Sequence, residues 1–395
     1  MGENMLNKKI FLVIFTVFFT LSFGKTKEPE IKIEQRYDNL IDDKIKIHIK
    51  YGGEDLPKLL DYVFVKTLYA RVRQNPWSNS EEIYRAKFDS KYLVKEKVRV
   101  GGTVWYKVVT PNGEGYIYGN TVQLRTFKFP KMLERIVEVE NFVNEKKNEK
   151  IKLASTNSYL PNPYNKDMRR TKDKYGVSID QNIVGVYKKE NIEIHIPDRS
   201  ILSVEKIDGK YAEVKVENIK ESPLKIEKKY LSYRPNIEKG FKKAVVVDVE
   251  NQNLGVFEKV ENDWILISYI YAKTGIESEL GFETPRGSYI VPMLKYEMGY
   301  RGLYGEDAGI AKYAIRFSGG GYLHGTPIEH DEEFNEDFFL NQKETGLGTF
   351  KGTRKCIRNT VSHSKFLFDW MMGDSKRNEK SNYQAPPENI IFIVI

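Results

Sequence analysis

The sequence predicts a mainly β protein. Short runs rich in Val, Ile, Tyr and Phe recur along most of the chain, and Gly, Asn and Pro separate them. Before the C-terminal third, only residues 131–150 repeat their apolar side chains with a helical period. With 395 residues, 40% of them hydrophobic, the chain is long enough for two or three domains with separate cores.

The N-terminus predicts export. Lys8 and Lys9 precede an apolar run over residues 10–23, and Ser22 and Gly24 are small residues placed where a signal peptidase would read them. The run is short for a bilayer span, which needs about 20 residues. We therefore expect a cleaved secretory signal at 1–24, an exported protein of the periplasm or cell envelope, and no stable membrane span after cleavage. An uncleaved anchor is the alternative.

Residues 58–130 form the first predicted β module. Its short strands alternate with turns, the strongest of which is Pro111-Asn112-Gly113, and this rhythm predicts a small barrel. The runs 68–73, 105–108 and 115–117 resemble a bacterial Src-homology-3-like (SH3-like) domain. That resemblance implies binding of cell wall or peptide. The aromatic residues could equally fill the barrel.

Residues 131–182 predict a connecting helix and a linker. Met132, Ile136, Val139 and Val143 recur at helical spacing, and the part that follows is poor in aliphatic residues and rich in Asn, Pro, Lys and Asp. Short alternating strands return over 183–235, with a hairpin turn at 208–209, and predict a possible second small β domain.

The last predicted domain covers 241–395. It opens with a buried strand at 244–249 and continues with Val- and Ile-rich runs. The apolar residues of 366–372 predict a packed helix, and 390–395 predict a closing strand.

Cys356 is the only cysteine, so it forms no internal disulfide. Exported proteins usually pair their cysteines, which makes a lone thiol more plausible as a reactive group. The basic residues Arg354, Lys355 and Arg358 surround it, and cations favour the thiolate. The simpler alternative is a small buried side chain.

Two motifs together resemble the L,D-transpeptidase (YkuD) catalytic domain family. The first is His324-Gly325-Thr326 after a glycine-rich turn, and the second is Thr353-x-x-Cys356-Ile357-Arg358. Thr274-Gly275 and Thr284-Pro285-x-Gly287 extend the likeness over about 150 residues. Arg354 and Lys355 replace the family's His-Gly, which removes an imidazole and a flexible glycine from beside the cysteine. The spacing between the motifs is about twice the usual one, which predicts an insertion.

The resemblance implies a mostly antiparallel β-sandwich with a short helix. It implies Cys356 as nucleophile and His324 as proton donor and acceptor, with Arg358, Thr353, Arg354, Gly325 and Lys355 in binding or supporting roles. It also implies the substrate: a tetrapeptide stem of peptidoglycan would lose its terminal D-Ala, and a diamino-acid amine would accept the acyl group in a 3-3 crosslink. A planar guanidinium such as that of Arg358 suits a stem carboxylate.

Three hypotheses for the function stay open: a transpeptidase, a hydrolase of the same fold that trims stems or releases wall-bound protein, and a non-catalytic wall-binding protein. No cofactor or metal is predicted. The acidic stretch 329–337 predicts a lid or a solvated surface, and His330 and His363 are further imidazoles that could assist. The net charge of +8 suits an anionic partner such as the cell wall. The mixed charges give no nucleic-acid signature.

Overall fold

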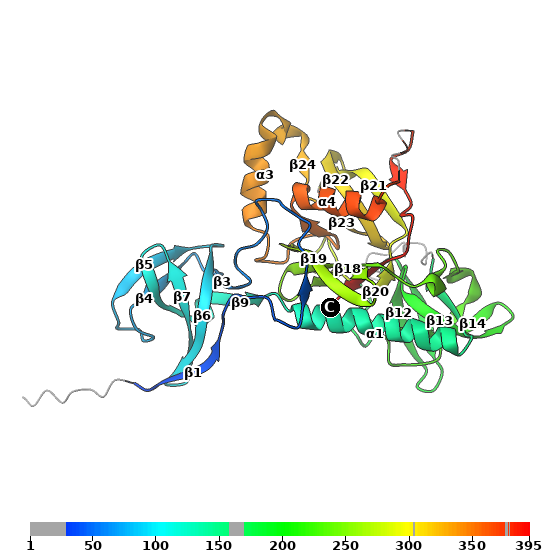
Figure 1. Ribbon diagram of the computed structural model, residues 1–395, viewed down its shortest axis with the longest axis horizontal. Coiled ribbons are helices and arrows are strands. Elements are labelled where there is room, and N and C mark those ends of the chain that lie inside the picture. Colours follow the sequence, from blue (N-terminus) through cyan, green and yellow to red (C-terminus); the bar gives the residue numbers. More distant parts are fainter. Residues whose placement is uncertain (1–28, 158–169, 303–304, 376–377, 379) are drawn as a thin grey trace, which may run out of the picture.

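The computed structural model describes residues 29–157, 170–302, 305–375, 378 and 380–395. The predicted signal sequence at 1–24 and part of the predicted linker lie outside them. Figure 1 shows a mainly β protein, as the sequence predicts, in which the described strands form four sheets. One sheet belongs to the N-terminal third, one to the middle of the chain, and two stack in the C-terminal third.

The N-terminal sheet is antiparallel and follows the order β5-β4-β8-β7-β6-β3-β9, with β1 paired to β6. Its end strands β5 and β9 do not pair, so the described strands do not close into the small barrel that the turn rhythm predicts. The strands are β1 (Ile31–Arg36), β3 (Asp61–Val65), β4 (Tyr69–Arg73), β5 (Glu82–Lys87), β6 (Lys91–Val100), β7 (Thr103–Thr110), β8 (Gly113–Tyr118) and β9 (Val122–Thr126), with the 3-10 turn η1 (Gly119–Thr121) before β9.

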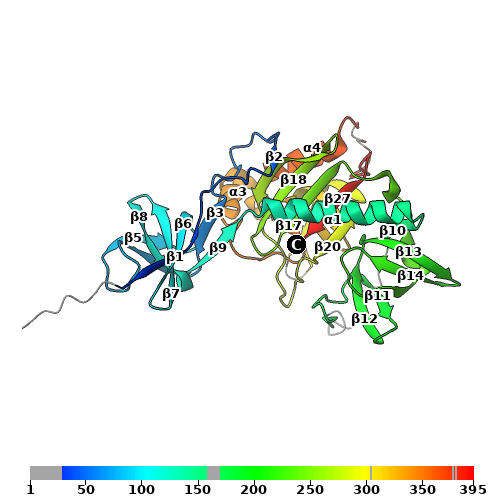
Figure 2. The same ribbon diagram turned by 60° about the horizontal axis from the view of Figure 1, so that its bottom comes forward.

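Helix α1 (Phe129–Asn148) confirms the predicted helix. Met132, Ile136, Val139 and Val143, the residues at helical spacing, are all buried. They form one core with the first C-terminal sheet, which α1 crosses in Figure 2. Burying each such side chain stabilises the fold by about 1.5–3 kcal/mol. The helix is thus part of the scaffold under the C-terminal domain as well as a connection.

The middle sheet is antiparallel in the order β12-β11-β15-β14-β13-β10-β16. It has a core of its own, and its end strands β12 and β16 do not pair, so the described strands again form no closed barrel. Its elements are β10 (Lys152–Thr156), β11 (Asn182–Tyr187), β12 (Ile192–Pro197), β13 (Ile201–Asp208), β14 (Tyr211–Val216), β15 (Leu224–Glu227), η2 (Lys228–Tyr230) and β16 (Leu231–Ser232).

The C-terminal domain is a sandwich of two sheets. The first has the order β2-β19-β18-β17-β27-β20, and the second has the order β25-β23-β22-β21-β26, with β24 paired to β22. The first sheet contains β2 (Lys46–Ile47), β17 (Lys243–Asp248), β18 (Asn253–Val260), β19 (Asp263–Tyr271), β20 (Gly287–Ile290) and β27 (Ile390–Val394), after η3 (Ile237–Lys239). The second contains β21 (Met293–Arg301), β22 (Asp307–Ser318), β23 (Gly321–Gly325), β24 (Ile328–Glu329), β25 (Ile357–Asn359) and β26 (Tyr383–Gln384).

One apolar core fills the space between these sheets. Phe317 of β22 stacks on Phe392 of β27, with 4.7 Å between ring centroids. Helix α4 (Val361–Met372), the predicted packed helix, adds Leu367 and Phe368 to the same core. The sandwich and the closing strand are therefore as predicted. Between β23 and β25 the chain inserts β24, η4 (His330–Asn335) and α3 (Glu336–Thr345).

Candidate functional site

Residues 352–358, which we call the cysteine loop, are held at both ends by the segment that follows β19. The amides of Gly352 and Thr353 donate to the Thr274 carbonyl at 2.9 and 3.1 Å. At the other end, Arg358 and Lys273 exchange two backbone hydrogen bonds of 2.8 Å. The Thr353 hydroxyl also donates to the Cys356 carbonyl. The loop therefore has a fixed conformation at the edge of the sandwich.

His324 lies on β23, and Cys356 directly precedes the neighbouring strand β25. Parallel pairing of β23 with β25 sets Leu323 opposite Ile357 and His324 opposite Arg358. Continued one residue back from β25, this register sets Cys356 opposite Tyr322, with the α-carbons of His324 and Cys356 about 8 Å apart for ordinary strand spacing.

The His324 ring has a defined tautomer. Nδ1 lies 2.7 Å from the Gly325 carbonyl oxygen, which only accepts hydrogen bonds, so Nδ1 carries the proton. Nε2 is therefore unprotonated, and its lone pair is free to accept a proton. Burial of the ring lowers the pKa of His324 to about 4, against the smaller opposing effect of the Gly325 carbonyl. The imidazole is therefore neutral at pH 7.

The thiol of Cys356 is partly buried against the glycine-rich turn, where Sγ donates to the Gly320 carbonyl at 3.8 Å. Burial raises the pKa of Cys356. The Tyr322 backbone, and then the charges of Lys355 and Arg358, act in the opposite direction. Because burial has the larger effect, the resting thiol is neutral, as is the imidazole of His324. Such a pair needs the imidazole to remove the proton as the sulfur attacks.

Arg358 is a positive charge that acts on several groups of the site. Its guanidinium is close enough to His324 and Cys356 to lower the pKa of both, and it also lowers the pKa of Lys273, on which burial acts more strongly. From the insertion, Glu332 experiences the same charge. Whether the stretch 329–337 is a lid or a solvated surface stays a prediction.

The charged groups of Arg354 and Lys355, which replace the family's His-Gly, have polar partners outside the cysteine loop. The Arg354 guanidinium donates to the carbonyls of Arg301 and Gly302 at 2.9 and 3.3 Å. Lys355 is buried, and its ammonium lies 3.5 Å from Oδ2 of Asp180. Its backbone has a φ of 122°, a conformation that side chains other than glycine rarely adopt. Neither residue supplies an imidazole to the thiol.

Glycine is required at two positions around the site. A Cβ on Gly275 would lie 2.8 Å from the Lys355 α-carbon and 2.4 Å from the Phe282 carbonyl oxygen. A Cβ on Gly325, a predicted supporting residue, would lie 3.0 Å from the Val361 α-carbon at the start of α4. Both glycines therefore allow the close backbone approaches that shape the site.

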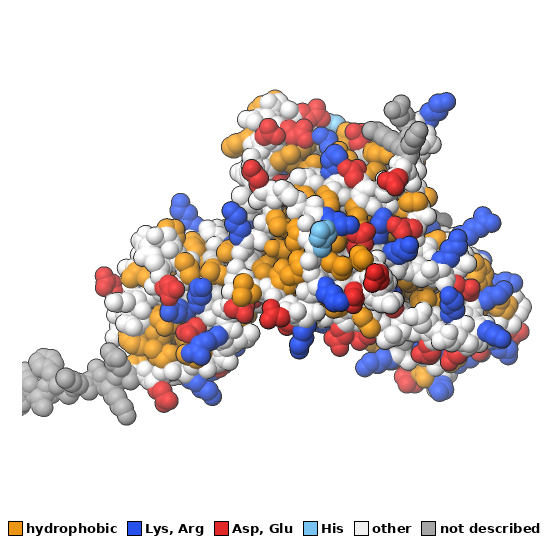
Figure 3. All heavy atoms as spheres, in the orientation of Figure 1, with side chains coloured by type: hydrophobic (Ala, Val, Ile, Leu, Met, Phe, Trp, Pro, Cys, Tyr) orange, Lys and Arg blue, Asp and Glu red, His pale blue; other side chains and the backbone are white. Residues whose placement is uncertain are grey.

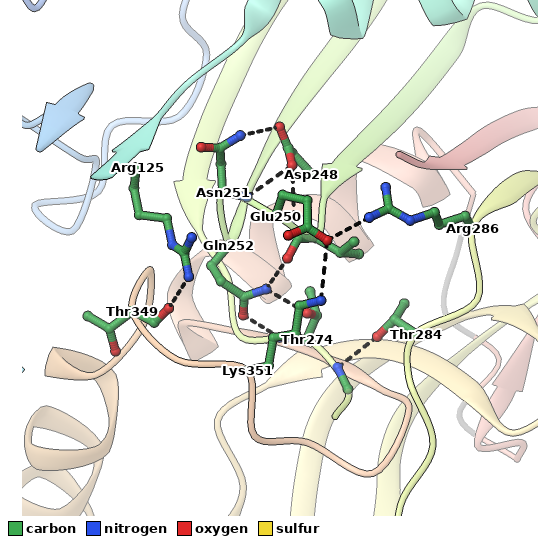
Figure 4. Close-up of polar contacts among 12 residues, drawn as sticks. Arg125, Asp248, Glu250, Asn251, Gln252, Thr274, Thr284, Arg286, Thr349 and Lys351 are labelled. Carbon is green, nitrogen blue, oxygen red and sulfur yellow. Dashed lines mark hydrogen bonds and ion pairs between the residues drawn. The ribbon is translucent and has the colours of Figure 1, made fainter. Parts of the chain in front are cut away.

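A polar network supports the cysteine loop from behind (Figure 4). The Thr284 hydroxyl accepts from the Gly275 amide at 2.8 Å and donates to the Lys355 carbonyl at 2.9 Å. The Gln252 side chain makes two hydrogen bonds with Thr274. Its Nε2 donates to the Thr274 hydroxyl at 2.6 Å, and its Oε1 accepts from the Thr274 backbone amide at 2.9 Å. Sequence reasoning did not select Thr284 and Gln252 as site residues. Thr284 belongs to the Thr-Pro-x-Gly motif that the resemblance already included, whereas Gln252 carries no comparable signal.

The other two imidazoles lie apart from the thiol. His363 is buried in α4 between the Ser268 hydroxyl at 2.8 Å and the Asn359 amide at 3.0 Å. Both its nitrogens are therefore engaged. His330 is exposed and pairs with Asp307 and Glu333. Both imidazoles thus have partners other than Cys356, whereas His324 lies on the strand that pairs with β25.

Residues of the N-terminal part of the chain also contact segment 348–350, which lies just before the cysteine loop. The Tyr62 hydroxyl donates to the Gly348 carbonyl at 2.7 Å, and Arg125 donates to the Thr349 carbonyl at 3.0 Å (Figure 4). Phe350 packs between Phe64 and Phe88, with ring centroids 4.8 and 5.5 Å away. The segment 348–350 is thus held three to five residues before Thr353, the first predicted supporting residue of the loop.

Replacing Gly348 by Ala tests this clamp. Gly348 has a φ of +80°, and a Cβ there would lie 2.6 Å from the Tyr62 hydroxyl oxygen. We expect Gly348→Ala to lower the free energy of unfolding by about 1–3 kcal/mol, measured by urea denaturation. Gly352→Ala is the matched control, because its Cβ would meet only the Lys273 side chain, at 3.5 Å. It should change that free energy by no more than about 0.5 kcal/mol. Equal effects of the two changes would contradict the clamp.

A cavity of about 380 Å³ lies beside the cysteine loop. Its lining includes Lys355, Asp180 and Thr284, together with Tyr175 and Phe282. Across the face seen in Figure 3, Lys and Arg side chains are interspersed with Asp and Glu rather than gathered in one basic patch. In the described part of the chain, no group of three or more His, Cys, Asp or Glu residues has metal-binding geometry. The described helices also include none that is long and apolar enough to cross a membrane.

Comparisons with known proteins give similarity only to solved structures. No family model matches the chain, and no curated protein matches it by sequence. An L,D-transpeptidase from Stackebrandtia nassauensis is similar at 18% identity and a TM-score of 0.25, over 40% of this chain and 56% of that one. An L,D-transpeptidase from Mycobacterium smegmatis is similar at 10% identity and a TM-score of 0.27, over 74% of this chain and 90% of that one.

A third similar structure is the L,D-transpeptidase of Xylanimonas cellulosilytica, with 16% identity and a TM-score of 0.22 over 41% of this chain and 65% of that one. This chain spans about half the length of the Stackebrandtia protein. The assignment of a reaction therefore rests on the residues themselves.

Proposed function

We propose that this protein is an exported cysteine acyl-transferase of the L,D-transpeptidase type, which acts on the stem peptides of peptidoglycan. The observation that carries the proposal is the state of His324. Its Nδ1 is committed to the Gly325 carbonyl, it is neutral at pH 7, and its strand β23 pairs with β25, which directly follows Cys356. These are the properties of a base for a thiol nucleophile.

In the proposed first step, the Cys356 sulfur attacks the carbonyl of the peptide bond before the terminal D-Ala of a tetrapeptide stem. Nε2 of His324 takes the thiol proton as the carbon–sulfur bond forms. When the tetrahedral intermediate collapses, the carbon–nitrogen bond breaks and the same proton passes to the departing D-Ala amine. The product is a thioester on Cys356. Backbone amides around Lys355 and Cys356 are the expected donors to the oxyanion.

In the second step, the side-chain amine of a diamino acid on a neighbouring stem attacks the thioester. His324 accepts a proton from that amine and returns it to the sulfur, so the enzyme regains its starting state with a new 3-3 crosslink. Arg358 carries the charge that would bind a stem carboxylate, since a guanidinium matches a carboxylate with two parallel hydrogen bonds. Thr353 and Gly325 shape the two backbone segments, and Arg354 ties the loop to Arg301 and Gly302.

Purified full-length protein, incubated with disaccharide-tetrapeptides and followed by mass spectrometry, tests the proposal. We expect loss of D-Ala, appearance of crosslinked dimers, and a covalent acyl adduct that maps to Cys356. Loss of D-Ala without dimers would instead identify an L,D-carboxypeptidase, in which water is the acceptor. Retention on cell wall with neither product nor adduct would identify a wall-binding protein and would reject the enzyme proposal.

A further inference from the structure

Lys355 carries two unfavourable features at the position directly before the proposed nucleophile. Its φ of 122° strains the backbone of a residue with a side chain, and its ammonium is buried. Glycine would avoid both. A lysine is tolerated there only if its side chain gains a partner that a glycine could not have.

Asp180 is that partner. It is itself buried, and the Lys355 ammonium lies 3.5 Å from its Oδ2 and 3.3 Å from its backbone carbonyl oxygen. The buried carboxylate of Asp198 and the thiol of Cys356 are the other titratable groups that act on this ammonium. Asp198 already pairs with Arg316 at 2.6 Å, so the direct ion pair of Lys355 is with Asp180.

Asp180 comes from outside the C-terminal domain. It lies just before β11, at the end of segment 170–182, which docks on the loop 276–283. In that contact Arg170 donates to the carbonyls of Glu279 and Gly281 at 2.6 and 3.3 Å, and its guanidinium covers the Phe282 ring at 4.7 Å from the centroid. Lys172 pairs with Glu277 in the same contact. Asp180 is thus fixed to the side of the cysteine loop by several independent interactions.

The two ends of Lys355 are therefore held by different parts of the protein. The Thr284 hydroxyl of the C-terminal domain donates to the Lys355 carbonyl at 2.9 Å and so restrains the backbone of Lys355. Asp180 of the segment before the middle sheet holds its ammonium. If the ion pair is removed, the ammonium can leave through the adjoining cavity, and the strained backbone before Cys356 can relax.

We propose that Asp180 is a positioning residue for Cys356: through its buried ion pair with Lys355, it holds the peptide unit before the thiol in the strained conformation that presents the sulfur to His324. The middle part of the chain then contributes directly to the site. The inference deepens the proposed function and rests on it for its catalytic meaning. The geometry of the thiol can be tested without any peptidoglycan substrate.

The test measures the rate at which iodoacetamide alkylates Cys356 at pH 7, together with D-Ala release. Two effects of Asp180→Asn have opposite signs. Deleting a nearby negative charge would by itself favour the thiolate and accelerate alkylation. A displaced cysteine loop would instead move the Cys356 sulfur away from the His324 imidazole and slow alkylation. We expect Asp180→Asn to slow alkylation and to lower kcat by at least about tenfold, with KM changed less than about threefold.

The double variant Asp180→Asn/Lys355→Gly provides the rescue. Glycine adopts a φ of 122° without strain and leaves no buried ammonium, so the double variant should recover most of the lost rate. Glu227→Gln is the matched control, since it removes a partly exposed carboxylate that pairs with Lys229 outside this contact, and it should leave both rates unchanged. Circular dichroism confirms that every variant is folded.

Unchanged or faster alkylation in Asp180→Asn would overturn the proposal, as would a double variant no better than the single one. The alkylation result is independent of the proposed function. If the wild type releases no D-Ala but its alkylation follows the expected pattern, the transpeptidase assignment fails and the positioning role of Asp180 stands.

Discussion

Replacing Cys356 by Ser or Ala is expected to abolish D-Ala release, with kcat/KM lowered by at least about 10³-fold. The change removes the atom that forms the thioester. Serine retains a similar shape, but its hydroxyl is far less acidic than a thiol, and the imidazole that must activate it is a weak base with a pKa of about 4. Incubation with a carbapenem, followed by intact-mass measurement, should give one adduct on the wild type and none on either variant.

The structure allows this loss to be separated from unfolding. The Cys356 thiol donates a weak hydrogen bond to the Gly320 carbonyl at 3.8 Å, so its replacement removes little stabilisation. We expect the urea midpoint of Cys356→Ser to match that of the wild type. A folded Cys356→Ala variant that still releases D-Ala would eliminate the proposed mechanism, whichever acceptor the enzyme uses.

Local patterns in the sequence predicted the elements that depend on local physics. The apolar spacing of Met132 to Val143 predicted α1 because a helix must bury one face, and the run at 390–395 predicted β27 because it is apolar throughout. The two motifs around His324 and Cys356 predicted segments that the strand register places side by side. The catalytic roles of their residues stay predictions until they are assayed.

Long-range contacts were beyond the reach of those patterns. Whether a set of short strands closes into a barrel depends on the pairing of its two end strands, and no local signal specifies that pairing for β5 with β9. The partner of Lys355 is Asp180, 175 residues earlier, in a segment whose composition predicted only a linker. The positive φ of Lys355 could not be predicted from the sequence either, because such angles are expected at glycine.

The arrangement of the three parts follows from these contacts. Tyr62 and Arg125 of the N-terminal sheet hold the segment before the cysteine loop, and Asp180 holds the loop itself. A loop gripped on two sides by separate parts of the chain is pre-organised, so less of the binding energy of a substrate is spent on ordering it. The two flanking sheets thus have a structural connection to the thiol, in addition to any role in binding the wall.

Replacing His324 by Gln is expected to lower kcat by about 10²–10⁴-fold with a small change in KM, because proton transfer is lost while the surface that binds substrate remains. The matched control is His330→Gln, which changes an exposed imidazole paired with Asp307 and Glu333 and should leave kcat unchanged. Wild-type activity in His324→Gln would reject His324 as the base.

The pH dependence of carbapenem acylation distinguishes the role of His324 from a general loss of structure. In the wild type the neutral imidazole accepts the thiol proton, so the rate should be flat from about pH 5 to neutrality and should fall only as His324 is protonated, with its pKa of about 4. In His324→Gln only the spontaneously formed thiolate reacts. Because burial raises the pKa of Cys356, that rate should climb about tenfold per pH unit from pH 6 to 8. A wild type that climbs with the same slope would show that its thiol ionises without the imidazole, and the pairing of His324 with Cys356 would then have no part in the reaction.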